Sequence, residues 1–270
     1  MRFDRYFEDK DNVYILLDIC HNQSLSDLVR RRKRMHCLEA RYYIWQLVKG
    51  IQYVHSCKFI HRDLKLGNLF LTEKMQLKIG DFGLAAQVYY EGEKKKTICG
   101  TPNYLSPEVL ESPNGHSYEV DFWAIGVILY TMLCGRPPFE SAEVKQTYQK
   151  IKVGHFNFPE SVEVHPFAKH FIRSCLVLDP AKRMTLEEML ESDYLSYMPV
   201  PRQLPVSTLV CPPADSYVLP YRLPDASQLR QNNQMMSPTP KSANKGKSFR
   251  NIGSAQKTNM KSPNCLRTDS

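Results

Sequence analysis

The stretch HRDLKLGN, at residues 61–68, decides the fold, because it places an aspartate, a lysine and an asparagine at fixed intervals in one short segment. Two further stretches follow it. Asp81-Phe82-Gly83 comes thirteen residues after the asparagine, and Ser106-Pro107-Glu108 comes later in the chain. Carboxylate and amide oxygens are hard ligands of the kind that bind Mg²⁺. Each stretch alone would be weak evidence, whereas three in a fixed order are a specific combination.

The segments that flank these stretches predict an α+β fold. Asn12–Ile19 is a β-branched and aliphatic run that predicts a buried strand. The helical spacing of apolar side chains over Ala40–His55 predicts a long helix that faces the core. Asn68–Leu71 and Leu77–Ile79 predict a hairpin that ends just before Asp81. Further helices are expected after a capping box at Ser24 and Asp27, through Arg34, and at Glu119–Leu133, Ala142–Val153, Pro166–Leu176 and Thr185–Leu190.

The composition predicts a soluble intracellular protein. The chain of 270 residues has room for one large domain, or for one domain and a tail, and its hydrophobic content of 42% is that of a globular protein. No apolar segment follows Met1 as in a secretory signal, and the longest apolar run, 124–134, is too short to cross a bilayer. The eight cysteines are scattered without a C-x-x-C pair, so we expect reduced thiols and a cytosolic or nuclear location.

Changes in composition divide the chain into three parts. Residues 1–198 mix apolar and charged stretches, residues 199–224 form a Pro-containing connector, and residues 225–270 predict a disordered basic tail. The tail holds eight Lys and Arg against two Asp, so it carries +6 of the net charge of +8. Because the basic excess lies in the tail, the charge argues against a nucleic-acid-binding domain. Binding through the tail itself would show a steep salt dependence.

The three stretches, in this order and on these elements, resemble the signature of the protein kinases: catalytic loop, metal-binding triplet and A-P-E-like element. The resemblance implies phosphoryl transfer from ATP, in which positioning and charge neutralisation supply most of the catalysis. It implies that Asp63 accepts or orients the proton of the substrate hydroxyl, and that Asn68 and Asp81 bind Mg²⁺. Lys65 stands where serine/threonine kinases place a cation against the transferred phosphate, and Thr101 stands where a threonine helps to position the same acceptor.

Within the protein kinases, the chain resembles the polo-like family. The shared stretches are HRDLKLGNLFL, KIGDFGLAA, CGTPNYLSPEVL and GRPPFE, with Leu204-Pro205 in the connector, and the resemblance covers about residues 2–215. It implies that Leu17 is the gatekeeper, that Asp18 to Cys20 form the hinge that binds adenine through backbone groups, and that Phe70 is the floor beneath the adenine ring. Core packing alone would also account for Leu17 and Phe70.

The resemblance also implies regulation, partners and a location. Thr97 lies between Asp81 and Glu108, and a phosphate there would add about −2 charge that would pair with Arg62. We therefore expect an upstream kinase to activate the protein at Thr97. The expected partners are protein substrates of a cell-cycle kinase. The protein is expected to act as a monomer without a membrane, in the cytoplasm or nucleus, including the centrosome or spindle.

Several positions are expected to support the site without taking part in the chemistry. Glu108 and Arg183 stand where kinases form a buried ion pair, and Asp121 stands where a carboxylate binds the backbone of the catalytic loop. Losing one partner of such a pair commonly costs ~3–5 kcal/mol. His61 is expected to pack and hydrogen-bond within the loop. Met184 departs from the proline that is usual in the family.

The sequence starts where the fourth strand of a kinase small lobe would begin. No G-x-G-x-x-G loop, strand lysine or helix glutamate precedes the first stretch. We therefore expect residues 1–198 to be a partial kinase domain, with a small-lobe remnant at 1–20 and the helical large lobe at 21–198. The tail is too short and polar for a polo-box module.

Two interpretations of function remain at this stage. One is a polo-like serine/threonine kinase that uses ATP and Mg²⁺, whose activity resides in a complete protein of which this chain is a part. The alternative is a catalytically dead kinase-lobe fragment that acts as a protein-binding module. The intact set of Asp63, Lys65, Asn68 and Asp81 favours the enzyme, because a scaffold has no chemical need for all four.

Overall fold

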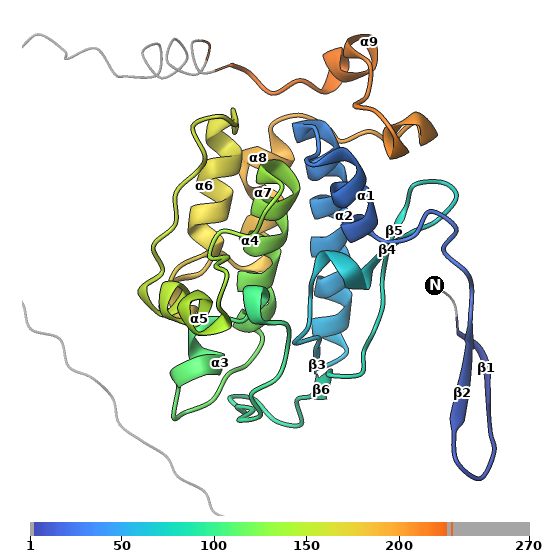
Figure 1. Cartoon of the computed structure of the whole chain (residues 1–270), viewed down its shortest axis with the longest axis vertical. Coiled ribbons are helices and arrows are strands. Elements are labelled where there is room, and N and C mark those ends of the chain that lie inside the picture. Colours follow the sequence, from blue (N-terminus) through green and yellow to red (C-terminus); the bar gives the residue numbers. More distant parts are fainter. Residues whose placement is uncertain (1–2, 226–227, 229–270) are drawn as a thin grey trace, which may run out of the picture. The chain divides into compact units, whose positions relative to one another are not determined.

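The computed structural model describes residues 3–225 and residue 228, and most of its regular structure is helical (Figure 1). The two longest helices, α2 (Cys37–Ser56) and α4 (Glu119–Cys134), pack against each other, and α6 (Pro166–Cys175) packs against α4. Several helices with a few short strands agree with the predicted α+β fold. In the described residues the other helices are α1 (Leu25–Arg32), α3 (Pro107–Glu111), α5 (Val144–Val153), α7 (Leu186–Glu191), α8 (Asp193–Ser196) and α9 (Asp215–Val218), with the 3₁₀ helices η1 (Leu66–Asn68), η2 (Pro102–Tyr104), η3 (Pro180–Lys182), η4 (Val206–Leu209) and η5 (Leu219–Tyr221).

Capping side chains fix where the first two helices begin. The predicted capping box of α1 is confirmed: Ser24 Oγ accepts from the N–H of Asp27 (3.3 Å), whose carboxylate accepts from the N–H of Ser24 (3.1 Å). Helix α2 begins at Cys37 instead of residue 40, because His36 caps it. Nδ1 of His36 accepts from the N–H of Leu38 (3.2 Å), and Glu39 Oε2 accepts from the N–H of His36 (2.9 Å).

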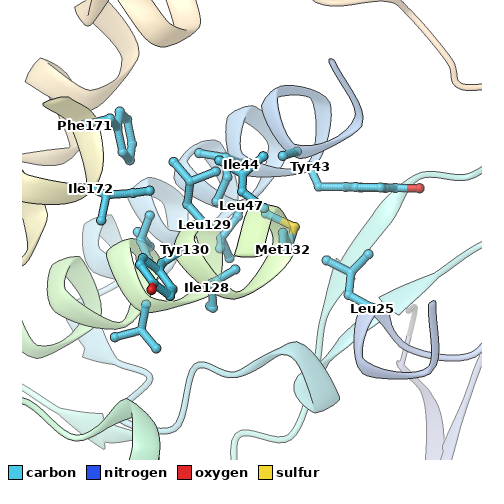
Figure 2. Packing of buried hydrophobic residues seen from close by; sticks show 14 of the residues in the cluster. Leu25, Tyr43, Ile44, Leu47, Ile128, Leu129, Tyr130, Met132, Phe171 and Ile172 are labelled. Carbon is cyan, nitrogen blue, oxygen red and sulfur yellow. The ribbon is translucent and has the colours of Figure 1, made fainter. Parts of the chain in front are cut away.

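The core lies between the long helices. Ile44 and Leu47 of α2 belong to the same buried cluster as Leu129 of α4 and Phe171 of α6 (Figure 2). Helix α4 is buried along most of its length, which explains why its sequence is apolar on every face. Burying one such side chain contributes about 1.5–3 kcal/mol. The cluster therefore gives the polar loops beside it a rigid support.

Two small antiparallel ladders hold the ends of the polar loops. The predicted hairpin is confirmed: β4 (Leu69–Leu71) pairs with β5 (Leu77–Ile79), with Leu69 opposite Ile79. A second ladder joins β3 (Phe59–Ile60) to β6 (Ala86–Gln87). The loop at 61–68 runs from β3 towards β4, and Asp81 lies between β5 and β6. Both ends of each loop are thus tied to a strand.

A third sheet is exposed, which corrects one prediction. β1 (Phe3–Glu8) pairs with β2 (Val13–Leu17), so the strand expected at Asn12–Ile19 is present. Its predicted burial is wrong: Ile15 is 61% exposed and Leu17 is 47% exposed. In the part of the chain that the structure describes, this sheet has two strands, and a two-stranded sheet alone cannot cover its own faces.

The connector is folded against the helices. It contains η4, α9 and η5, and the side chains of Leu204 and Thr208 are buried. Arg41 of α2 donates to the carbonyl oxygens of Tyr194 (2.8 Å) and Tyr221 (2.9 Å), so α2 and the connector are joined directly. The domain boundaries at 20 and 198 stay predictions. The predicted disordered tail lies outside the described residues apart from Asp225 and Gln228.

Two further features concern the cysteines and the apolar character of the helices. Each cysteine in the described part of the chain is a free thiol. Among the helices described, none combines the length and the apolar character that a membrane crossing requires.

Candidate active site

Asp63 is the centre of a compact hydrogen-bond cluster. Its side chain is buried, and each carboxylate oxygen has more than one donor. Oδ1 accepts from the N–H of Thr101 (3.0 Å) and from its hydroxyl (2.8 Å). Oδ2 accepts from Nζ of Lys65 (2.6 Å) and from Nδ2 of Asn68 (3.2 Å). Charge-assisted hydrogen bonds of this kind fix the orientation of a carboxylate.

Lys65 and Thr101 also contact each other. Nζ of Lys65 donates to the hydroxyl oxygen of Thr101 (2.9 Å), so the three side chains close a triangle with Asp63. Lys65 comes from the catalytic loop, whereas Thr101 comes from the segment before η2, which is 36 residues away along the chain. The triangle places the ammonium group of Lys65 beside the buried carboxylate of Asp63.

Asn68 and Asp81 are brought to the same end of the β4–β5 hairpin. The N–H of Gly80 donates to the carbonyl oxygen of Asn68 (2.9 Å), which fixes the backbone next to Asp81. Nδ2 of Asn68 donates to the backbone carbonyl oxygen of Asp63 (2.9 Å), which fixes the orientation of the Asn68 amide group. Asp81 is exposed, its φ is +60°, and its Oδ1 accepts from the N–H of Gly83 (3.3 Å). A left-handed backbone at a non-glycine residue is often found at functional sites.

Asp121 supports the catalytic loop from below. Its Oδ2 accepts from the N–H of His61 (2.9 Å) and its Oδ1 accepts from the N–H of Arg62 (3.0 Å). Arg62 also has a positive φ, +66°, so two fixed hydrogen bonds hold a strained turn. The His55 ring contacts Oδ2 of Asp121 at 2.8 Å. Nothing in the sequence singled out His55, because its partner lies 66 residues away.

His61 has a structural environment. Its ring is fully buried, and Nδ1 accepts from the N–H of Asp63 (3.3 Å) while Nε2 lies 3.1 Å from the carbonyl oxygen of Gly80. The centroid of the Phe82 ring lies 4.8 Å from the centroid of the His61 ring. His61 therefore links the loop of Asp63 to the loop of Asp81.

Glu108 and Arg183 form a bidentate ion pair. Nη1 and Nη2 of Arg183 each lie 2.6 Å from one carboxylate oxygen of Glu108. The side chain of Glu108 is 8% exposed and that of Arg183 is 0% exposed. Arg183 also donates to the carbonyl oxygens of Val177 (2.8 Å) and Glu119 (2.9 Å) and lies over the ring of Trp123. The pair thus joins the start of α3 to the start of α4 and the segment before α7.

The predicted regulatory pair is not in contact. Thr97 is exposed, and Nε of Arg62 donates to the carbonyl oxygen of Leu84 (2.7 Å). Near Thr97, Lys95 and His116 exchange two backbone hydrogen bonds of 2.8 Å, which tie this segment to the chain before α4.

The predicted adenine-binding residues come from β2, from the segment after it and from β4. Leu17 ends β2, and Asp18 and Cys20 follow it in an extended segment. The carbonyl oxygen of Cys20 accepts from the N–H of Gln23 (3.2 Å) in a turn that leads to α1. Phe70 is half-buried in β4 and its backbone bridges to that of Ser24. The backbone thus brings Phe70 next to the segment that follows the hinge.

The fold and the cluster around Asp63 agree with the resemblance to the protein kinases. A comparison with protein families agrees: the model described as "Protein kinase domain" matches residues 1–195. The chain belongs to the protein kinase domain family.

Several similar curated proteins carry PLK or polo names, which confirms the predicted polo-like resemblance. The chain is 49% identical to serine/threonine-protein kinase PLK1 of Xenopus laevis, over 78% of this chain and 35% of that protein. It is 46% identical to serine/threonine-protein kinase polo of Drosophila melanogaster, over 79% of this chain and 36% of that protein. It is 52% identical to probable serine/threonine-protein kinase CCRP1 of Zea mays, over 90% of this chain and 38% of that protein. The chain thus spans well under half the length of these relatives.

Proposed function

We propose that the protein transfers the γ-phosphate of ATP to serine or threonine hydroxyls of protein substrates. The observation that carries this proposal is the triangle of Asp63, Lys65 and Thr101. A binding module would gain nothing from a buried carboxylate with four donors and a neighbouring ammonium group. The same cluster therefore weighs against the dead-fragment alternative.

The chain's own residues would act by position and charge. Asp63 is held by Thr101 and Asn68, so it faces a substrate hydroxyl in one fixed orientation and takes its proton. Lys65 would stabilise the charge on the transferred phosphoryl group, as a cation next to the acceptor can in a partly buried site. The loop geometry that places both side chains depends on Asp121.

The oxygen atoms of Asn68 and Asp81 suit Mg²⁺. Nδ2 of Asn68 donates to the carbonyl oxygen of Asp63, which leaves the side-chain oxygen of Asn68 available to a metal, and the Asp81 carboxylate is exposed just after the hairpin that begins at Leu69. Mg²⁺ commonly takes one or two protein oxygens and completes its shell with phosphate and water. Bound there, the ion would neutralise charge on the ATP phosphates. Leu17, Asp18, Cys20 and Phe70 are proposed to hold the adenine group.

Substrate class, location and assembly are proposed from the polo-like resemblance. We propose protein substrates with a role in the cell cycle, and action as a monomer in the cytoplasm or nucleus, including the centrosome or spindle. Imaging of the tagged native protein through one cell cycle tests the location. A uniform distribution at every stage would contradict it.

We propose Thr97 as the activating phosphosite, modified by an upstream kinase. Thr97 is exposed, and Arg62 lies one residue from Asp63, so a phosphate that recruits Arg62 would act directly on the catalytic loop. In the native full-length protein, Thr97→Asp is expected to exceed Thr97→Ala in activity. Equal activity of the two variants would contradict the proposal.

The central test is phosphate transfer by the native full-length protein. Radiolabelled ATP, Mg²⁺ and dephosphorylated casein are expected to give phosphoserine and phosphothreonine. Asp63→Asn is expected to lower kcat by about 10²–10⁴-fold, the range of a general base. Glu160→Gln, which changes an exposed carboxylate, is the matched control and should leave the rate unchanged. An active Asp63→Asn variant, or an inactive native protein, would overturn the proposed function.

A further inference from the structure

A large cavity lies away from the candidate active site, between the helical lobe and the connector. It holds about 770 Å³ and is bounded by the segment from α1 to α2, the start of α6 and residues 210–225. A volume of this size falls in the range of small-molecule sites. One part of its wall is apolar and another part is basic: Met35, Leu133, Val164, Val218 and Leu223 form the apolar part, and Arg31, Arg34, Arg41 and Arg222 lie in the basic part.

Arg41 is the most unusual residue of this wall. Its side chain is 1% exposed, and its guanidinium group donates to carbonyl oxygens of Tyr194, Met198 and Tyr221. No carboxylate pairs with it among the described residues. Burial lowers the pKa of Arg41, but a guanidinium group stays charged in proteins. A buried charge without a counter-ion is costly, and carbonyl dipoles offset only part of that cost.

The residues around Arg41 add positive charge. Residues 30–34 read RRRKR, and in this run Arg32 is neutralised by Glu39 in a buried pair. Arg34 is exposed and has no ion pair within the described part of the chain. Arg222 has only a distant carboxylate, Asp215 at 3.9 Å, and both side chains are exposed. Such a pair contributes little.

Two histidines and two carboxylates also lie on the cavity wall. His36 and His165 both cap helices through Nδ1, so the N-terminal ends of α2 and α6 open onto the cavity. Burial together with the charges of Arg32 and Arg222 lowers the pKa of His36. The carboxylates in the wall are Glu163 and Asp225, both of them exposed. Cationic groups therefore outnumber anionic groups on the wall.

We infer that this cavity binds a small organic anion, with a phosphate or carboxylate head beside Arg34, Arg41 and Arg222 and an apolar body along Val164, Val218 and Leu223. The anion would supply the counter-charge that Arg41 lacks, and the apolar wall would be covered by the rest of the molecule. The ligand needs both an anionic head and an apolar body, because the wall has both a basic part and an apolar part. This site is separate from the cluster around Asp63 and does not depend on phosphoryl transfer.

The test measures binding of decyl phosphate to the whole chain by calorimetry. The decyl phosphate is kept at concentrations where it does not form micelles. Decanol, which has no charge, and inorganic phosphate, which has no apolar body, are each expected to bind at least tenfold more weakly than decyl phosphate. A charge-assisted hydrogen bond contributes enough to account for about a tenfold change. Equal binding of decanol and decyl phosphate would overturn the inference.

Exposed positions provide variants that keep the fold. Arg34→Gln combined with Arg222→Gln is expected to weaken decyl phosphate binding at least tenfold. Arg173→Gln combined with Arg202→Gln removes the same charge from exposed sites outside the cavity wall and should change binding less than twofold. Val210→Glu places a carboxylate on the cavity wall at a side chain that is 71% exposed, and should also weaken binding. Equal losses in the two double variants, or no loss in the first, would overturn the inference.

Discussion

Thr101 donates two hydrogen bonds to one oxygen atom of Asp63: its N–H lies 3.0 Å and its hydroxyl 2.8 Å from Oδ1. The hydroxyl oxygen in turn accepts from Lys65. The segment that contains Thr97 is therefore fastened at its end to the proposed proton acceptor. A conformational change in that segment can therefore alter the position of Asp63 through these two hydrogen bonds.

The first prediction concerns this contact. Thr101→Val removes the hydroxyl and keeps the shape and the backbone hydrogen bond, so the free energy of unfolding should change by only about 1 kcal/mol. Phosphate transfer by the full-length protein should fall about 10–100-fold, because Asp63 and Lys65 lose a shared partner. Thr101→Ser is the control and should keep most of the activity. If Thr101→Val were as active as Thr101→Ser, the hydroxyl would have no positioning role.

The second prediction concerns the ion pair of Glu108 and Arg183. Glu108→Gln leaves a buried guanidinium group without its carboxylate, so the free energy of unfolding should fall by about 3–5 kcal/mol. Urea unfolding of the chain measures the loss. Lys182→Ala breaks a neighbouring pair with Asp179 whose side chains are 76% and 48% exposed, and should cost less than about 1 kcal/mol. Losses of similar size in the two variants would contradict the buried pair's role.

The third prediction concerns two glycines with positive φ. Gly115 has φ +79°, and a Cβ there would lie 2.4 Å from the carbonyl oxygen of Lys95, whereas Gly92 has φ +81° and open space around it. Gly92→Ala should cost about 1–2 kcal/mol from backbone strain alone. Gly115→Ala should cost more and should break the Lys95–His116 bridge. Faster hydrogen exchange at the Lys95 amide would reveal this, and equal exchange in both variants would contradict it.

The fourth prediction concerns stability against pH. Burial and the nearby Arg62 lower the pKa of His116, and burial with Arg32 lowers that of His36, each from 6.5. Because the folded state then binds fewer protons than the unfolded state, the free energy of unfolding should fall as pH drops below about 6.5. The raised pKa of Glu39 acts in the opposite direction.

Variants assign the slope to the two histidines. Urea midpoints measured between pH 7.5 and 5.5 should flatten in a variant that combines His36→Asn, which keeps a capping side chain, with His116→Gln. His170→Asn changes an exposed histidine and should leave the slope unchanged. A double variant with the original slope would show that other groups set it.

The sequence anticipated the parts of the structure that depend on local patterns. Apolar periodicity located α2 and α4, and the polar stretches identified Asp63 and Asp81 as neighbours of a hairpin. The start of α2 was missed because histidine is an uncommon capping residue. The strand at β1 was not predicted at all, and the burial expected for β2 was wrong because an apolar strand is buried only if another element covers it.

Long-range contacts could not be anticipated. A single arginine such as Arg41 in a predicted helix is usually expected to face solvent, and only the fold reveals that it points into the connector. The connector was recognised only from its prolines, and nothing in its sequence indicated that its carbonyl groups would accept from arginines of the helices. His55 escaped notice for the same reason, since its partner Asp121 is remote in the sequence.

The embedding of Arg41 has a practical consequence for anyone who prepares this domain by itself. The family match ends at residue 195, but two of the three carbonyl groups that receive this guanidinium group, those of Met198 and Tyr221, lie beyond that point. The segment that the family model matches is therefore shorter than the segment that packs around Arg41. A gene trimmed at residue 195 would remove two of the three acceptors of Arg41, and a gene trimmed after residue 225 would keep them.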